Sequence, residues 1–204
     1  MSDDWAVSRQ LFRDAADWFV ATTAQVGDRW SEPGLGDWDV RALVGHTSRS
    51  LLTVQTYLGI PAPAVDLDST TAYYLATSSI AAGPEVAQRG RDAGEALGVD
   101  PAAAVAAIAR RVLPLLDNTD GTELVTTVAG GMRLSAYLPT RTFELVVHTL
   151  DLGATLGLVA DPPPGAASQS LRIVADLAVA RGLAAPLLLA ATGRTLLPAG
   201  FSIL

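Results

Sequence analysis

Residues 137–156, with the sequence YLPTRTFELVVHTLDLGATL, decide the fold class of this chain. Apolar side chains recur along the stretch at helical spacing, Pro139 lies near its start and Gly157 follows its end. This combination of periodicity, entry proline and terminal glycine is typical of an amphipathic helix. Glu144 and His148 are four residues apart, so they project from one face of that helix about one turn apart.

The same helical periodicity extends over most of the chain on either side. A first helix is expected to run to about Gln25 with Asp3 or Asp4 as its N-cap, and a second to run from Asp39, a good N-cap, to about Leu58. Residues 26–37 form the loop between them, with Trp30 as an anchor. Further helices are expected within residues 66–82, where Ser69 or Thr70 is the cap, and over residues 84–97, 101–116, 167–181 and 184–191.

Residues 123–134 depart clearly from the helical pattern. Leu124–Val128 and Met132–Leu134 flank Gly130-Gly131, which predicts a short β-hairpin with its turn at the two glycines. The chain is therefore expected to be all-α in the main, with one small β element.

The run Pro162-Pro163-Pro164-Gly165 is typical of a linker. It predicts a helical bundle over residues 1–160 and a short C-terminal appendage, helical and then extended, over residues 161–204 packed on that bundle. We expect a monomer or a homodimer, because apolar helix faces can serve a core or an interface.

Composition excludes several functional classes. The net charge is -7 and the isoelectric point is near 4.7, which argues against nucleic acid as a partner. Cysteine is absent, so disulfides and thiolate ligands are excluded and any thiol must come from outside the chain. All 14 basic residues are arginine, and without lysine Schiff-base catalysis is excluded.

The chain is expected to be soluble and cytoplasmic. Its first residues lack the basic and apolar segments of a secretory signal. The most apolar region, residues 173–192, carries Asp176 and Arg181, and its uncharged part is too short to span a bilayer. No membrane association is expected.

The two histidines of the chain suggest a metal site. His148 and Glu144 can share one small ion, and His46, inside the second predicted helix, is the one remaining histidine. Two histidines and one carboxylate with an open position are the usual ligands of a catalytic zinc or iron ion. A Glu and a His at this spacing also occur as a plain side-chain pair, and nothing in the sequence proves that His46 is near. Spacing alone leaves both interpretations open.

Two segments carry a resemblance to a known family. Residues 38–46, WDVRALVGH, are similar to the W-x-V-x-x-L-V-x-H segment of the mycothiol-dependent maleylpyruvate isomerase family, a branch of the DinB-like bundles. Residues 141–152, RTFELVVHTLDL, resemble the R-x-x-E-x-x-V-H-x-x-D-L helix of the same family. Residues 192–194 and 197–201 resemble the end of its shorter members.

The resemblance implies a DinB-like up-down four-helix bundle that binds a divalent metal through His46, Glu144 and His148. Zinc is the first expectation, with nickel, iron or manganese as alternatives, and the family implies mycothiol, a low-molecular-weight thiol, as cofactor. Asp39 and Ala42 replace the family's frequent Thr and acidic residue, which alters helix capping and leaves the site untouched. The C-terminal portion is shorter than the family's full accessory domain, so the resemblance does not define the substrate.

The leading hypothesis is an enzyme in which a metal-held thiolate attacks a small electrophile. Elimination after bond rotation would give cis-trans isomerisation, and a persistent adduct would give S-transfer. A hydrolase with metal-activated water and a non-catalytic metal-binding or regulatory bundle are the alternatives.

Three further residues are candidates near this chemistry. Asp151 can orient His148 or take up a proton, or it belongs to a solvated polar face. Arg141, one turn before Glu144, is a candidate for binding the cofactor. Arg194 can bind a substrate carboxylate or make an ordinary surface ion pair. Trp30 and Trp38 are expected to pack without a chemical role. Tyr137 is expected to pack or to line the mouth of the cavity.

Overall fold

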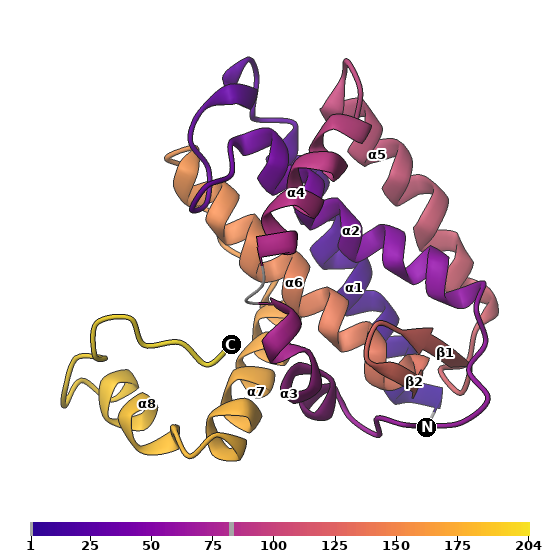
Figure 1. The fold of residues 1–204 in the computed structure, drawn as a ribbon, viewed down its shortest axis with the longest axis vertical. Helices are drawn as coiled ribbons and strands as arrows, with labels where there is room; N and C mark the ends of the chain where they lie inside the picture. The colour runs from indigo at the N-terminus through magenta and orange to yellow at the C-terminus, as the bar shows by residue number, and fades with distance from the viewer. Residues whose placement is uncertain (1, 82–83) are drawn as a thin grey trace.

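The computed structural model describes residues 2–81 and 84–204 and confirms a mainly α-helical fold with one short hairpin (Figure 1). The helices are α1 (Ser2–Thr23), α2 (Val40–Leu58), α3 (Thr70–Ala81), α4 (Pro84–Ala96), α5 (Pro101–Val112), α6 (Leu134–Thr155), α7 (Pro164–Ala180) and α8 (Ala184–Ala191). Two short 3-10 helices, η1 (Arg29–Ser31) and η2 (Leu113–Asn118), and the strands β1 (Leu124–Thr127) and β2 (Gly130–Arg133) complete the described elements.

Helices α1, α2, α5 and α6 form the bundle, and each packs against two of the others in a closed ring. Contacts at the helix ends give the directions of α1. Arg29, which follows α1, donates to the carbonyl of Leu156 at the end of α6, so these two helices run parallel. Trp5, near the start of α1, donates to the carbonyl of Thr119 beyond the end of α5, so α1 and α5 are antiparallel.

Helix α2 is parallel to α5 and antiparallel to α6. Arg111, near the end of α5, donates to Gln55 near the end of α2. Tyr137, in the first turn of α6, donates to the hydroxyl of Thr53 in the last turns of α2. Along the chain the bundle helices therefore run up, down, down and up, and the start of α2 lies beside the second half of α6.

Helices α3 and α4 lie between α2 and α5 in the sequence and pack on the outside of the bundle. Helix α4 approaches α2 closely because glycines face it. A Cβ atom on Gly94 would lie 2.8 Å from the carbonyl oxygen of Arg41, and one on Gly90 would lie 2.5 Å from the Trp38 ring. The Trp38 indole also donates to the carbonyl of Ala87 at 2.9 Å. This packing fixes Trp38 at the entrance to α2.

The hairpin is present, but its turn is not at the two glycines. Strand β1 ends at Thr127, Val128 and Ala129 form the turn, and Gly130 opens β2. Gly131 instead meets residues 62–64, where a Cβ atom would lie 2.8 Å from the Ala62 methyl group. Gly130 is therefore needed because its φ is +123°. Gly131 is needed because residues 62–64 pack closely against it.

Three predicted helix starts are wrong. Helix α7 begins at Pro164, so Pro164 and Gly165 of the predicted linker belong to the helix. Helix α1 begins at Ser2, so Asp3 and Asp4 lie inside it instead of capping it. Helix α6 begins at Leu134, directly after β2, which places Pro139 inside the helix. The loop before the hairpin allows the early start, because carbonyl groups of residues 121 and 123 accept the N–H groups of residues 135 and 134. The predicted cap at Asp39 is confirmed, and Asp100 caps α5 in the same way, since each side chain accepts a backbone N–H three residues on.

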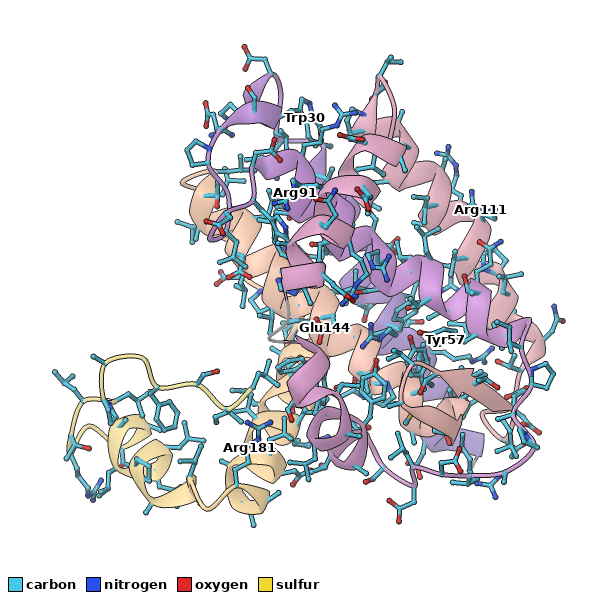
Figure 2. All side chains as sticks on the ribbon, in the orientation of Figure 1. Trp30, Tyr57, Arg91, Arg111, Glu144 and Arg181 are labelled. Carbon is cyan, nitrogen blue, oxygen red and sulfur yellow. The ribbon has the colours of Figure 1, made fainter. Side chains whose placement is uncertain are left out.

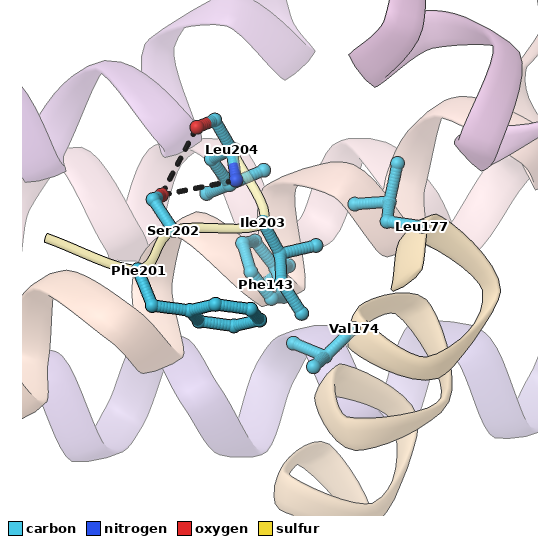
Figure 3. Close-up of a pocket in the computed structure, with 7 residues that line it drawn as sticks. All are labelled: Phe143, Val174, Leu177, Phe201, Ser202, Ile203 and Leu204. Carbon is cyan, nitrogen blue, oxygen red and sulfur yellow. Dashed lines mark hydrogen bonds between the residues drawn. The ribbon is translucent and has the colours of Figure 1, made fainter. Parts of the chain in front are cut away.

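The C-terminal residues leave the bundle and return to it. Helix α7 packs on α6, α3 and α1 through Ile173 and Leu177, whereas α8 packs on α7 and contains no buried residue. Figure 1 shows α8 and the following tail projecting from the bundle before the chain end comes back beside α7. There Phe201 and Ile203 face Phe143 of α6 (Figure 3).

In the part of the chain that the structure describes, every helix is too short or too polar to cross a membrane.

Candidate metal centre

The fold brings His46, Glu144 and His148 together although the first is far from the others in sequence. His46 lies two turns into α2, and the other two lie on one face of α6. One nitrogen or oxygen atom from each residue lies within 4.8 Å of those of the other two. The His46 and His148 ring centroids are 4.8 Å apart, and His148 Nε2 lies 3.3 Å from Glu144 Oε2. Glu144 is near the middle of the molecule (Figure 2).

The donor set fits a divalent ion. Two imidazoles and one carboxylate are the ligands expected for zinc or iron with positions left for water or substrate. The Nδ1 atom of His46 is buried and has no hydrogen-bond partner among the described residues, which is costly for a protein but suits a group near an ion. The side chains of Glu144 and His148 remain 20% and 15% exposed, so a ligand can reach them.

Asp151 lies directly behind His148. Its Oδ2 atom is 3.0 Å from His148 Nδ1, which leaves Nε2 on the side of Glu144. A carboxylate on the outer nitrogen of an imidazole fixes the ring orientation and raises its basicity as a ligand. Asp151 is one turn along α6 from His148, so the helix itself sets this contact.

Tyr74 is a site residue that the sequence did not indicate. It is buried on α3, and its hydroxyl lies 2.9 Å from Glu144 Oε1 and 3.1 Å from the carbonyl oxygen of Thr140. A hydrogen bond to the carboxylate orients it toward the histidines. The local pattern around Tyr73-Tyr74 predicts only a helix, and no spacing rule connects that helix to α6.

Trp38 contacts the site as well as anchoring α2. Its ring centroid lies 4.5 Å from that of His46, with the two planes inclined by 34°. The sequence predicted a packing role for Trp38, and the structure adds that one of its contacts is a candidate metal ligand. Because α4 holds the indole from the other side, Trp38 restricts the orientation of the His46 ring.

The protonation states of the three residues are coupled. Burial and the neighbouring His148 lower the pKa of His46 to about 4, so this imidazole is neutral. Burial also lowers the pKa of His148, but hydrogen bonds to Asp151 and Glu144 and their negative charges outweigh it and raise the value to about 9. For Glu144, burial raises the pKa, but His148, the Arg141 charge and Tyr74 lower it to about 2. Without an ion, His148 and Glu144 therefore form an imidazolium–carboxylate pair.

The two arginine candidates lie in different surroundings. Arg141 is largely buried beside Glu144, between the rings of Tyr73 and Tyr137. Arg194 is exposed in the tail after α8, where its Nη1 donates to the carbonyl of Thr192. Figure 1 shows α8 and the tail that follows it projecting from the bundle, and Arg194 forms no hydrogen bond or salt bridge with the three candidate ligands in the described part of the chain.

These features define a helical bundle with a group of side chains at its centre that could bind one metal ion. The chain belongs to the family described as the mycothiol maleylpyruvate isomerase N-terminal domain, whose family model matches residues 8–153. Membership implies a mycothiol-related, metal-binding function of the DinB-like type. Neither a search of curated proteins nor a search of solved structures gave a significant match.

Proposed function

We propose that this protein is a metal-dependent enzyme that uses a small thiol, mycothiol, to attack a small electrophile, giving cis-trans isomerisation or S-transfer. His46, Glu144 and His148 hold the ion, with zinc as our first choice. One observation carries the proposal: three ligand atoms from two helices lie within 4.8 Å of one another in a chain of this family. The active unit in this proposal is residues 1–160, with residues 161–204 as an appendage.

A divalent ion bound there would lower the pKa of a thiol on its open side and stabilise the thiolate. The chain contributes no thiol of its own, because it contains no cysteine. The side chains around the metal position would hold the ligand residues in place. Tyr74 orients the Glu144 carboxylate and Trp38 limits rotation of the His46 ring.

Asp151 has two tasks in this proposal. Its contact with His148 Nδ1 keeps Nε2 directed at the ion, which is a positioning role. Its side chain is also 29% exposed, so its carboxylate can take up a proton from solvent.

Metal analysis of the purified protein and of a His46→Ala variant tests whether the three proposed ligands bind a metal ion. We expect about one equivalent of zinc in the parent and little in the variant, because two ligands from one helix bind weakly without the third. Arg172→Ala on the exposed face of α7 is the matched control and should keep the parent content. Equal metal content in the parent and His46→Ala would contradict the site.

Turnover is tested with the metal-loaded protein and a panel of small electrophiles, each with and without mycothiol. Conversion that requires the thiol supports the proposal. Conversion by hydrolysis without thiol would replace it with a hydrolase, and tight binding without conversion would replace it with a metal-binding module.

A further inference from the structure

Helix α7 has a second apolar face, which the fold leaves uncovered. Ile173 and Leu177 are buried against the bundle, whereas Leu171, Ala175 and Val179 are exposed and lie on the opposite side of the helix. Leu171 and Val179 are large apolar side chains, and they are 68% and 70% exposed. We call these three residues the α7 stripe. Figure 1 shows α7 below the bundle, with α3 on one side and α8 on the other.

The spacing within the α7 stripe suits contact with another helix. Its members are four residues apart, so they form one continuous ridge of about 12 Å along the helix. Ridges of this spacing make the commonest class of helix–helix contact in globular proteins. Ala175, at the centre, is small and would let a second helix approach closely. A single exposed leucine needs no explanation, but a continuous apolar ridge on a solvent-facing side indicates a binding surface.

Two opposite charges flank the α7 stripe on one side. Arg172 and Asp176 are both exposed and follow Leu171 and Ala175 directly in the sequence. Within residues 2–81 and 84–204, neither side chain forms a salt bridge, although the two are one turn apart. The other flank of the stripe carries alanines at positions 167 and 178 and no charge. One edge of the stripe therefore offers a cation and an anion without partners among the described residues.

This pattern of charges is complementary to itself. In a two-fold contact the same surface of each copy meets the other. If two α7 helices pack antiparallel about Ala175, Leu171 of each copy meets Val179 of the other. The charged flanks then come to the same side, and Arg172 of one copy is offset by only about 3 Å along the helix axis from Asp176 of the other.

The antiparallel orientation is the one that uses both charges. It forms the contact between Arg172 and Asp176 twice in each dimer, once from each copy. A parallel two-fold pair would instead place the charged flank of one helix against the alanine flank of the other. The charges therefore favour the antiparallel orientation.

We infer that the α7 stripe is a homodimer interface in which the α7 helices of two copies pack antiparallel. The partner is a second copy of this chain, because the stripe and its charged edge match themselves in spacing and in sign. Burial of Leu171 and Val179 drives association, and the two charge pairs select the orientation. The inference goes beyond the proposed function and does not depend on it, since the candidate metal ligands lie on α2 and α6.

Sedimentation of the purified full-length chain over a series of concentrations tests the interface. We expect the parent to reach twice the chain mass of 21.1 kDa. Ala175→Glu should raise the dissociation constant about a hundred-fold or more, because two carboxylates meet at the centre of the contact. Val7→Glu on α1 is the matched control, since Val7 is also an exposed apolar residue on a helix, and it should keep the parent constant. Circular dichroism should be the same for all three proteins.

Charge exchange tests the orientation. Arg172→Asp alone brings like charges together twice in each dimer and should weaken association about ten-fold or more, as should Asp176→Arg alone. The double variant, Arg172→Asp with Asp176→Arg, reverses both pairs. Its dissociation constant should return to within roughly three-fold of the parent value.

Each contrary result has a definite meaning. A parent that stays monomeric at the highest concentration measured overturns the inference and leaves the stripe to a different partner. A dimer that Ala175→Glu does not weaken is formed by another surface, which also overturns it. A double variant as weak as the single variants overturns the antiparallel contact. The zinc content of Ala175→Glu should equal that of the parent, so a failure of this inference leaves the proposed function untouched.

Discussion

The bundle and the C-terminal appendage (residues 161–204) are both rich in apolar residues but use them differently. In the bundle, Phe12 and Phe19 are fully buried, whereas Leu188 in α8 is 63% exposed and Leu196 in the tail is 94% exposed. The most apolar region of the sequence, residues 173–192, thus includes α8, which has no buried residue. Apolar content alone does not locate a core, because burial also requires a second surface against which the side chains can pack.

The candidate functional residues are also divided between the bundle and the appendage. All three candidate ligands lie on bundle helices whose neighbours hold them from several sides, and Arg194 of the appendage lies apart from them. Precise side-chain geometry needs rigid support, which a packed bundle supplies and a helix with one neighbour does not.

The largest expected effect compares one buried and one exposed side chain from the two regions. Phe12→Ala should lower the free energy of unfolding by about 3–5 kcal/mol, because it leaves a cavity among α1 and its neighbours. Leu188→Ser should change it by less than about 0.5 kcal/mol, since that side chain is exposed. Urea unfolding followed by circular dichroism measures both, and equal losses would show that α8 contributes to the core.

Removal of one hydroxyl tests how strongly α3 supports the metal ligands. Tyr74→Phe should weaken zinc binding about ten- to a hundred-fold, because Glu144 loses the donor that orients it. Tyr57→Phe is the matched control and should keep the parent affinity for zinc, since its hydroxyl contacts no described residue. Competition with a chelator measures both constants. Unchanged affinity in Tyr74→Phe would show that the hydrogen bond is only structural.

The smallest expected effect is the pH dependence of zinc binding, which is set by the protonation of His148. Its pKa of about 9 in the metal-free protein means that zinc must displace a proton at neutral pH, whereas His46 is already neutral. Zinc affinity should therefore rise with pH up to about 9, by about ten-fold per pH unit, and fall as the pH is lowered. Calorimetry in buffers of different ionisation enthalpy should show about one proton released at pH 7. Release of no proton would contradict the imidazolium–carboxylate pair.

Between about pH 6.5 and 9, the free energy of unfolding of the metal-free protein should fall as the pH rises, whereas its zinc affinity should rise. A group whose folded-state pKa is raised stabilises the fold below its unfolded value, which is 6.5 for His148, and this contribution is lost as the pH rises toward 9. Opposite slopes of zinc affinity and of unfolding free energy against pH would therefore separate the effect of His148 on metal binding from its effect on folding.

Sequence patterns were sufficient for the helical fold class, the hairpin and the helix that carries Glu144 and His148, because these depend on local periodicity and on residues a few positions apart. The wrong starts of α1 and α6 and the misplaced turn show where this fails. Leu134 starts α6 because carbonyls of a preceding loop receive its first N–H groups, and Gly131 is required by the chain at residues 62–64. Both causes lie outside the local window.

Only the tertiary structure decided which distant side chains meet. His46 reaches α6 because α2 runs antiparallel to it, and Tyr74 and Trp38 reach the site because α3 and α4 pack on the outside of the bundle. No spacing rule encodes such contacts, since they depend on how whole helix faces pack. The chemical identity of the candidate ligands was therefore readable in the sequence, while the groups that orient them and the exposure of α8 depended on the packing.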